Sequence, residues 1–433
     1  MTRHVLPAPE QGDRVVLAAL SSPRPRREPE GEGGALEELR ALASSAGAEV
    51  VDEMLQRRGK PDTATFFGRG KVQELKAVVA AAGAEVVVFD NDLTPAQGKN
   101  LEDALGVRVM DRSELILDIF AERARTREAK LQVELAQLQY MLPRLRRMWT
   151  HLSRIRGGIG LRGPGETQLE VDQRTIRDRI GTLKEKLADI EKRRELQRRG
   201  RTDAWNVALV GYTNVGKSTI MNRLAGERLR AENRLFATLD ATTRKVTLPE
   251  GEEIVLTDTV GFIRDLPHHL VASFRATLEE VVHADLLLHV VDVADSRHPE
   301  QMRVVHAVLE ELGVRGTPIL PVFNKLDLVP AAERAAVRAR VLAEHPDAVV
   351  ASAVEARGLV ALQEALAEVV RGGTRRAVVT LPLEAARALA HLYEVGEVLE
   401  RRYTEDGVEV ELRARPEVLE RLRNEGLTLR AAS

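Results

Sequence analysis

Near the middle of the chain, a stretch of nine residues combines two glycines with a lysine and a serine. It reads GYTNVGKST at 211–219, follows the apolar run NVALV and satisfies the pattern G-x-x-x-x-G-K-[ST]. Glycines allow the backbone to curl with its N–H groups pointing inward, and the N-terminus of the helix that follows favours anions. We expect Lys217 to reach the β- and γ-phosphates of a nucleotide and the Ser218 hydroxyl to bind Mg²⁺.

A second stretch, DTVG at 258–261, ends the apolar run EEIVLT. Asp258 suits a role in holding Mg²⁺ directly or through water, and the amide of Gly261 can sense a γ-phosphate. The segment 233–245 is the expected first switch, in which one threonine hydroxyl should bind Mg²⁺ when GTP is present. The spacing does not choose among the candidates, which are Thr238, Thr242 and Thr243.

Two further motifs follow later strands and indicate which base is read. In NKLD at 324–327, the Asp327 carboxylate can accept hydrogen bonds from guanine N1–H and N2–H₂, and adenine has no such donor pair. In ASA at 351–353, Ser352 and Ala353 are expected to close over the base from the other side. All these motifs come at strand ends, so the sequence predicts a guanine-nucleotide site at the edge of a doubly wound sheet.

The residue after Gly261 bears on the rate of hydrolysis. Ras-like enzymes have a glutamine there, which orients the attacking water. This chain has Phe262, whose side chain cannot hydrogen-bond water. We therefore expect slow intrinsic hydrolysis that a partner stimulates by supplying or ordering a water-positioning group.

Strand and helix patterns alternate in the first 112 residues and again after residue 204, which is typical of α/β domains. The apolar strands of the later region are near-continuous, as in a parallel sheet covered on both faces. Four domains are expected: 1–112, a small α/β domain; 113–203, an antiparallel helical hairpin with a glycine-rich loop; 204–373, a P-loop GTPase domain with a doubly wound sheet; and 374–433, a small α+β domain.

The hairpin is predicted from two narrow apolar seams. Leucines from Leu131 to Leu152, with Trp149 among them, recur at spacings of four and three, and so do the apolar residues from Ile176 to Ile190. The two helices flank the loop RGGIGLRGPGETQLE, which should therefore lie at or near the tip of the hairpin. Pro143 lies inside the first helix and should kink it, because proline removes one backbone donor.

The stretch YMLPRLRRMWTHLSRIR at 140–156 contains five arginines and no acidic residue. Arginines with interleaved aromatic residues suit phosphate pairing and base stacking, so we expect RNA contact here. The alternative is a solvated basic face of the helical pair, and for Trp149 a place in the apolar seam is favoured. The predicted RNA-binding residues are Arg144, Arg146, Arg147, Arg154, Arg156 and Arg162.

The composition limits the classes of protein to which the chain can belong. The chain has 433 residues, enough for about three domains, and a net charge of −2, which does not exclude local basic stripes. It has no cysteine, which excludes disulfides, thiolate catalysis and cysteine-ligated metals. No apolar run reaches the length of about 18 residues that a membrane helix needs. We expect a cytoplasmic protein that is a monomer and does not insert into membranes.

The chain resembles the HflX family of ribosome-associated GTPases, which belong to the translation-factor class. The resemblance covers roughly residues 10–430 and is carried by GGIGLRGPGETQLEVD, LVGYTNVGKSTIMNRL, LFATLDATTR and DTVGFIRDLP. It implies that the protein binds GTP and GDP with Mg²⁺, binds the 50S ribosomal subunit and its rRNA, and splits stalled 70S ribosomes, notably after heat stress. It also implies that the hairpin is directed towards the peptidyl-transferase region.

The resemblance assigns site residues as well. The implied nucleotide contacts are Gly211, Tyr212, Thr213, Asn214, Val215, Gly216, Lys217, Ser218, Phe236, Ala237, Thr238, Leu239, Asp240, Asp258, Thr259, Val260, Gly261, Asn324, Lys325, Leu326, Asp327, Ser352, Ala353 and Val354. The implied Mg²⁺ ligands are Ser218 and Thr238, which selects Thr238 among the three threonines by resemblance alone. Catalytic roles fall on Lys217, Thr238 and Gly261.

Two alternative functions stay open at this point. The protein could be an assembly checkpoint that binds maturing ribosomal subunits, or a signalling switch whose hairpin recruits a protein partner. Salt dependence separates these classes, because phosphate contacts make binding fall steeply with ionic strength. An apolar seam between two proteins would respond little.

Overall fold

A computed structural model of the chain describes residues 12–21, 34–155, 168–199, 204–226, 235–236, 238–249, 251–264, 275–355, 357–382, 385–404 and 407–431. Only the backbone is described for residues 34–35, 146–155, 168–169, 195–199, 275–277, 386, 394 and 431. The chain divides into two compact units. The first holds Met1–Ile190, Glu232–Asp240 and Asp265–Ala276, and the second holds Glu191–Ala231, Ala241–Arg264 and Thr277–Ser433.

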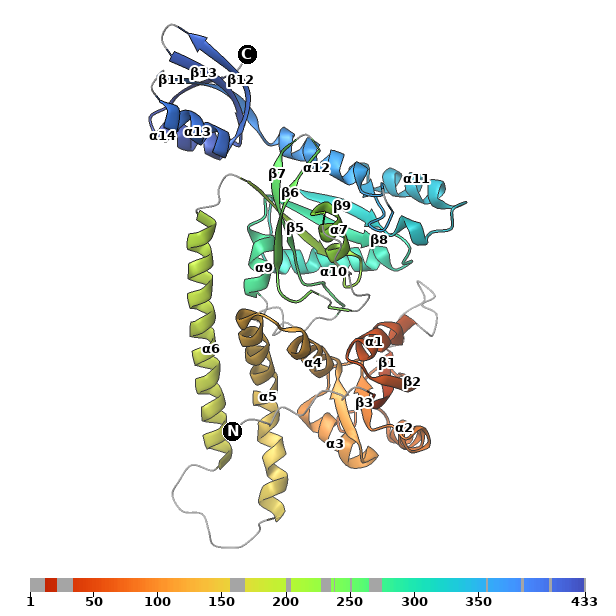
Figure 1. Ribbon diagram of the computed structural model, residues 1–433. Coiled ribbons are helices and arrows are strands. Elements are labelled where there is room, and N and C mark those ends of the chain that lie inside the picture. Colours follow the sequence, from red (N-terminus) through yellow and green to blue (C-terminus); the bar gives the residue numbers. More distant parts are fainter. Residues whose placement is uncertain are drawn as a thin grey trace. The chain divides into compact units, whose positions relative to one another are not determined.

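The first unit begins with a parallel four-stranded sheet in the order β2-β1-β3-β4. Its strands are β1 (Arg14–Ser21), β2 (Glu49–Arg57), β3 (Val86–Phe89) and β4 (Arg108–Asp111). The helices between and after them are α1 (Gly34–Ser45), α2 (Arg69–Ala82), α3 (Pro95–Leu105) and α4 (Arg112–Arg123). All four residues of β3 are buried, because helices cover both faces of the sheet, as expected from the strand–helix alternation (Figure 1).

Two long helices follow, α5 (Arg127–Ile155) and α6 (Gln168–Arg199), and α5 runs through Pro143. On α6, the seam predicted from the spacing is the less exposed face, and Leu183 on it is fully buried. The Arg179 guanidinium joins α6 to α5 through two hydrogen bonds to the Glu134 carboxylate, of 2.7 and 2.9 Å. The predicted helix pair is confirmed, and the glycine-rich loop between the helices lies outside the described residues.

The second unit contains a six-stranded sheet in the order β10-β9-β8-β5-β7-β6, in which only β6 is antiparallel to its neighbour. Its strands are β5 (Trp205–Gly211), β6 (Thr242–Thr247), β7 (Glu253–Asp258), β8 (Leu286–Asp292), β9 (Ile319–Asn324) and β10 (Val349–Val350). The helices around it are α7 (Lys217–Leu224), α9 (Arg275–Val282), α10 (His298–Glu311), α11 (Arg334–Glu344) and α12 (Val360–Gly372).

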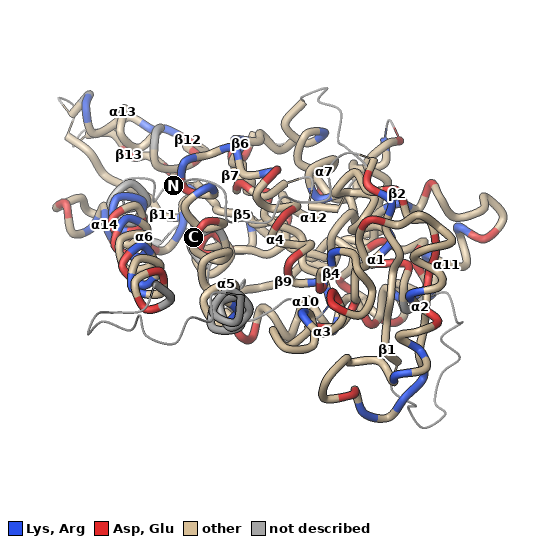
Figure 2. The backbone as a smooth tube through the Cα atoms, turned by 90° about the horizontal axis from the view of Figure 1, so that it is seen from below, with Lys and Arg blue, Asp and Glu red and all other residues tan. Residues whose placement is uncertain are grey.

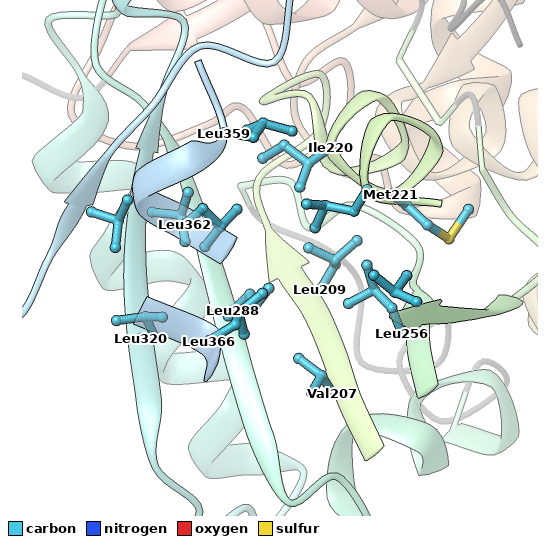
Figure 3. Close-up of a cluster of buried hydrophobic side chains, with 14 of the residues drawn as sticks. Val207, Leu209, Ile220, Met221, Leu256, Leu288, Leu320, Leu359, Leu362 and Leu366 are labelled. Atoms are coloured by element: carbon cyan, nitrogen blue, oxygen red, sulfur yellow. The ribbon is translucent and has the colours of Figure 1, made fainter. Parts of the chain in front are cut away.

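The core of this sheet lies between its strands and the helices α7 and α12. Figure 3 shows apolar side chains of both helices over those of the strands, and all of them are buried. The residues include Leu209, Ile220, Leu288, Leu362 and Leu366. The carboxyl ends of the parallel strands are thereby held at one edge, where the predicted motifs begin.

The chain ends in a βαββαβ domain whose four strands are all antiparallel, in the order β12-β13-β11-β14. It consists of β11 (Arg375–Leu381), α13 (Ala386–Val395), β12 (Glu397–Thr404), β13 (Gly407–Ala414), α14 (Pro416–Asn424) and β14 (Thr428–Ala431). Arg415 joins it to the larger sheet, because its guanidinium forms bonds of 2.6 and 3.0 Å with the Asp285 carboxylate. The same group lies over the Trp205 ring. The predicted α+β fold is confirmed.

Candidate nucleotide site

The loop between β5 and α7 can form only with glycine at two positions. A Cβ on Gly211, whose φ is +153°, would lie 2.3 Å from the carbonyl oxygen of Val290. A Cβ on Gly216, whose φ is +99°, would lie 2.4 Å from the Asn324 amide nitrogen. These separations are far below van der Waals contact. Gly211 is therefore required by the close approach of the β8 backbone, and Gly216 is favoured by its left-handed φ and by the Asn324 side chain that packs against it.

Lys217 lies at the start of α7 and is only 6 % exposed. Its ammonium group donates hydrogen bonds to the carbonyl oxygens of Gly211 at 3.0 Å and Tyr212 at 2.8 Å. Burial lowers the pKa of Lys217 to about 8, and the nearby Asp258 carboxylate opposes this shift. The ammonium therefore lies across the loop, where phosphate oxygens could replace the two carbonyl acceptors.

Ser218 and Asp258 form the part of the site that suits Mg²⁺. The Ser218 hydroxyl donates a hydrogen bond of 2.5 Å to Asp258 Oδ2, and the aspartate is fully buried at the end of β7. Mg²⁺ prefers hard oxygen ligands and keeps several water and phosphate ligands, so these two groups fit it. Within the described part of the chain, no three His, Cys, Asp or Glu side chains gather to hold a metal by themselves.

The segment after β7 is bonded directly to the phosphate loop. The Thr213 amide donates to the Phe262 carbonyl at 2.8 Å, and the Phe262 amide donates to the Gly211 carbonyl at 3.1 Å. A Cβ on Gly261 would lie 2.8 Å from Thr213 Cα and 2.9 Å from Lys217 Nζ. The backbone at Gly261 is thus held against the phosphate loop, and the role of its amide as a γ-phosphate sensor stays a prediction.

Phe262 itself is 0 % exposed, so its ring is part of the core rather than of the site. A buried phenyl ring cannot orient water, as the sequence already indicated. The next described contact in this segment is from the Arg264 amide to the Tyr212 hydroxyl, at 2.7 Å. The attacking water must therefore be oriented by a group other than residue 262.

The residues predicted to read the base are brought together from two loops. Asn324 Nδ2 donates to the Val215 carbonyl at 2.9 Å, and its Oδ1 accepts from the Ala353 amide at 3.0 Å. Asp327 Oδ1 accepts a 2.6 Å hydrogen bond from the Ser352 hydroxyl. Asn324 therefore ties the phosphate loop, 211–218, to both base-reading loops, 324–327 and 351–355. Ser352 orients the Asp327 carboxylate, which is predicted to bind guanine.

Lys325 and Val354 complete the two loops. Lys325 has a φ of +66°, and its ammonium group lies 2.7 Å from Asp292 Oδ2 at the end of β8. Leu326 begins the short 3₁₀ helix Leu326–Leu328. Val354 is 64 % exposed.

The first switch is divided between the two units: its part around Thr238, up to Asp240, belongs to the first unit, and Thr242 and Thr243 belong to the second. The Leu235 amide donates to the Ser45 hydroxyl at 3.1 Å, and the Phe236 ring meets the Phe120 ring edge-on at 4.6 Å between centroids. Phe236 and Leu239 are both buried, and Ala237 lies outside the described residues. Because Ser218 belongs to the second unit, the role of Thr238 as an Mg²⁺ ligand stays a prediction.

Asp240 closes this segment with a contact that sequence reasoning missed. Its carboxylate accepts hydrogen bonds from the amides of Arg125 at 3.1 Å and Thr126 at 3.2 Å, and from the Thr126 hydroxyl. Thr126 in turn caps α5, since its Oγ1 accepts from the Ala129 amide at 3.1 Å. A negative charge at a helix N-terminus is favourable, so Asp240 stabilises the start of the hairpin.

Arg144, one of the predicted RNA-binding residues, has an acidic partner. Its guanidinium donates to Asp111 Oδ2 at 2.8 Å and lies over the Tyr140 ring, 3.4 Å from the centroid. The Tyr140 hydroxyl donates to Asp111 Oδ1 at 2.9 Å. Burial raises the pKa of Asp111 to about 6, against the lowering effect of Arg144. Its own stretch of sequence has no acidic residue, but the fold supplies Asp111 as a partner, and Arg144 thereby fixes α5 to the end of β4.

The other predicted RNA-binding arginines are not tested by these contacts. The side chains of Arg146, Arg147 and Arg154 are not described, and Arg156 and Arg162 lie outside the described residues. Along α6, basic and acidic residues are intermingled (Figure 2). The charge of that helix is therefore of both signs. The sequence stretch 192–201, which overlaps the end of the helix, has six basic residues and one glutamate.

Together, the phosphate loop, the Ser218–Asp258 pair and the base-reading loops define a P-loop GTPase. Family models match the chain in three parts: "GTP-binding GTPase N-terminal" at 34–121, "GTP-binding GTPase Middle Region" at 123–201 and "50S ribosome-binding GTPase" at 206–325. The chain belongs to the HflX family of GTPases, and its reaction is the hydrolysis of GTP to GDP and phosphate.

The relatives that show this are similar over nearly their whole length. GTPase HflX of Caldanaerobacter subterraneus subsp. tengcongensis is 47 % identical over 414 residues, which are 95 % of this chain and 93 % of that protein. GTPase HflX of Escherichia coli (strain K12) is 46 % identical over 387 residues, 89 % of this chain and 90 % of that protein. A solved structure titled "crystal structure of SsGBP and GDP complex" is 26 % identical, with a TM-score of 0.47, and covers 82 % of this chain and 98 % of that chain.

No helix within the described ranges is long and apolar enough to span a membrane.

Proposed function

We propose that this GTPase acts on the ribosome in the cytoplasm: it binds the 50S subunit through its hairpin and N-terminal domain and separates stalled 70S ribosomes. The observation that carries the proposal is the hairpin. Its helices have 29 and 32 residues, which correspond to about 44 and 48 Å at 1.5 Å per residue. Such an arm can carry a basic, glycine-rich tip deep into folded RNA.

The attachment of α5 to the N-terminal sheet supports this role. Asp111 is bonded to both Tyr140 and Arg144, and all three lie at the junction of β4 with the middle of α5. A helix held at its middle by a buried, charge-assisted network is stiff, since bending it would leave buried polar groups unpaired. A stiff arm can compete sterically with tRNA or with contacts between the ribosomal subunits.

Hydrolysis would be slow on the free protein and faster on the ribosome. When bound, Mg²⁺ would neutralise charge on the β- and γ-phosphates, with Ser218, Asp258 and Thr238 as its protein partners. Lys217 would move its hydrogen bonds from the loop carbonyls to the phosphates, and the Gly261 amide would bind the γ-phosphate. Phe262 leaves the water unoriented, so we propose that a ribosomal group completes the site.

Sedimentation of 70S ribosomes with the protein tests the proposal directly. Sucrose gradients are run with GTP, GDP and a non-hydrolysable GTP analogue. We expect conversion of 70S ribosomes into subunits in the triphosphate states, and cosedimentation of the protein with 50S subunits. Absence of cosedimentation in every nucleotide state would refute a ribosomal role, and binding restricted to immature subunits would favour the assembly checkpoint instead.

Charge-neutralising variants test the tip of the hairpin. The Arg156→Ala/Arg162→Ala variant should bind 50S subunits more weakly and reduce the salt dependence of binding by about two counterions. The matched control is Lys184→Ala/Lys186→Ala, which removes the same charge from exposed positions of α6. If both variants bind 50S subunits like the wild type, the glycine-rich loop is a linker.

A further inference from the structure

Arg334, the first residue of α11, contacts both loops that read the base. Its Nε donates to the Val329 carbonyl at 2.9 Å, and its Nη2 donates to the Asp327 carbonyl at 2.6 Å. Its Nη1 donates to Glu355 Oε1 at 3.1 Å. One guanidinium thus holds the backbone at Asp327 and two residues after it, and reaches the loop that carries Ser352.

We propose that Arg334 is a positioning residue that sets guanine specificity by fixing the direction of the Asp327 carboxylate. The carboxylate must accept from guanine N1–H and N2–H₂ at once, so a small rotation would lose one of the two bonds. Ser352 holds one carboxylate oxygen, Asp327 Oδ1, at 2.6 Å, but a single hydrogen bond permits rotation about it. The bond from Arg334 to the carbonyl of Asp327 fixes the backbone from which the carboxylate projects.

The contacts of Arg334 do not contribute equally. The ion pair with Glu355 joins side chains that are 34 % and 48 % exposed, so water screens it and its contribution is small. The bonds to the carbonyls of Asp327 and Val329 are partly buried and come from a charged donor, which makes them stronger. Loss of Glu355 should therefore matter much less than loss of Arg334.

The planar fork of arginine is what allows three acceptors to be held at once. A lysine at this position carries one compact ammonium group, which cannot reach both carbonyls and the Glu355 carboxylate in the same geometry. Arg334→Lys therefore keeps the charge and the start of α11 but loses the bridge. It is the variant that separates positioning from folding, while Arg334→Ala removes all three contacts.

Arg338, one turn later on α11, offers a matched control. Its Nη2 donates to the Val350 carbonyl at 3.2 Å, so it too ties α11 to the sheet, but it makes no described contact with either base-reading loop. Arg338→Ala removes a guanidinium of the same helix. We expect it to leave nucleotide preference unchanged.

The test is a comparison of GDP with inosine diphosphate, which lacks the exocyclic amine of guanine. Dissociation constants are measured for the full-length wild type and for the Arg334→Ala, Arg334→Lys and Arg338→Ala variants. In both Arg334 variants we expect GDP affinity to fall about tenfold and inosine diphosphate affinity about twofold or less, because one charge-assisted bond to the base is lost. The GDP preference should thus fall about fivefold.

Equal weakening of both nucleotides would mean that Arg334 only supports the fold of the loops, and the proposal would be wrong. An unchanged GDP preference in Arg334→Lys would overturn it as well, even if Arg334→Ala failed to fold. This experiment uses nucleotides alone, so its outcome is independent of whether the protein acts on ribosomes.

Discussion

Gly261 should tolerate no side chain if its amide is the γ-phosphate sensor. In Gly261→Ala, the new methyl group would lie 2.8 Å from Thr213 Cα and 2.9 Å from Lys217 Nζ. Carbon atoms pack at about 3.5–4.0 Å, so the backbone must move by roughly 0.7–1.2 Å away from the phosphate loop. A displacement of about 1 Å at a reacting centre costs roughly 100-fold in rate, or about 2.7 kcal/mol in the barrier.

The assay is single-turnover GTP hydrolysis at saturating Mg²⁺, together with the dissociation constants for GDP and GTP. We expect the rate constant to fall about 100-fold. GDP has no γ-phosphate, so the affinity of the variant for GDP should stay within about threefold of the wild-type affinity. A loss confined to the triphosphate and to the chemical step would identify Gly261 as part of the switch.

Gly98→Ala is the matched control for this substitution. Gly98 lies within α3, and no atom lies within 4 Å of the position that its Cβ would take. Alanine in a helix interior should stabilise the protein by about 0.5–1 kcal/mol and leave hydrolysis unchanged. A Gly261→Ala enzyme that hydrolyses GTP within about threefold of the wild-type rate would refute the steric reasoning.

Three further predictions concern protons, base identity and the switch. Bound phosphates should raise the pKa of Lys217 back towards its ordinary value. Nucleotide binding at pH 8 should therefore take up about half a proton, and above pH 8 the affinity should fall by up to about tenfold per pH unit. Calorimetry in buffers of different ionisation enthalpy measures the uptake, and proton release would contradict it. Asp327→Asn should shift preference from guanine to xanthine diphosphate in binding assays, because an amide donates where the carboxylate accepts; retained guanine selectivity would exclude base recognition by this residue. Asp240→Ala should speed hydrogen exchange at the start of α5 about fivefold, since the helix loses a capping carboxylate, whereas Thr94→Ala at the cap of α3 should leave α5 unchanged. Equal exchange at α5 in the two variants would show that Asp240 does not stabilise the hairpin.

The sequence by itself determined the features that depend on local spacing. The phosphate loop was readable because a strand, two glycines and a lysine follow one another directly, and backbone conformation is decided within such a stretch. The seam on α6 was readable for the same reason, because helical periodicity alone selects which side chains share a face. The order of strands and helices likewise predicted the α/β fold and the small terminal α+β domain.

Only the tertiary structure decided which side chains meet across long separations in the chain. Arg144 pairs with Asp111 from a strand 33 residues earlier, and Asp240 caps a helix that begins more than 100 residues before it. Arg334 holds the loop that carries Asp327 through carbonyl groups, which every residue has and which therefore leave no trace in a sequence. Periodicity shows which face of a helix is covered. It does not show which other element covers that face, because this depends on how separate elements pack in the folded chain.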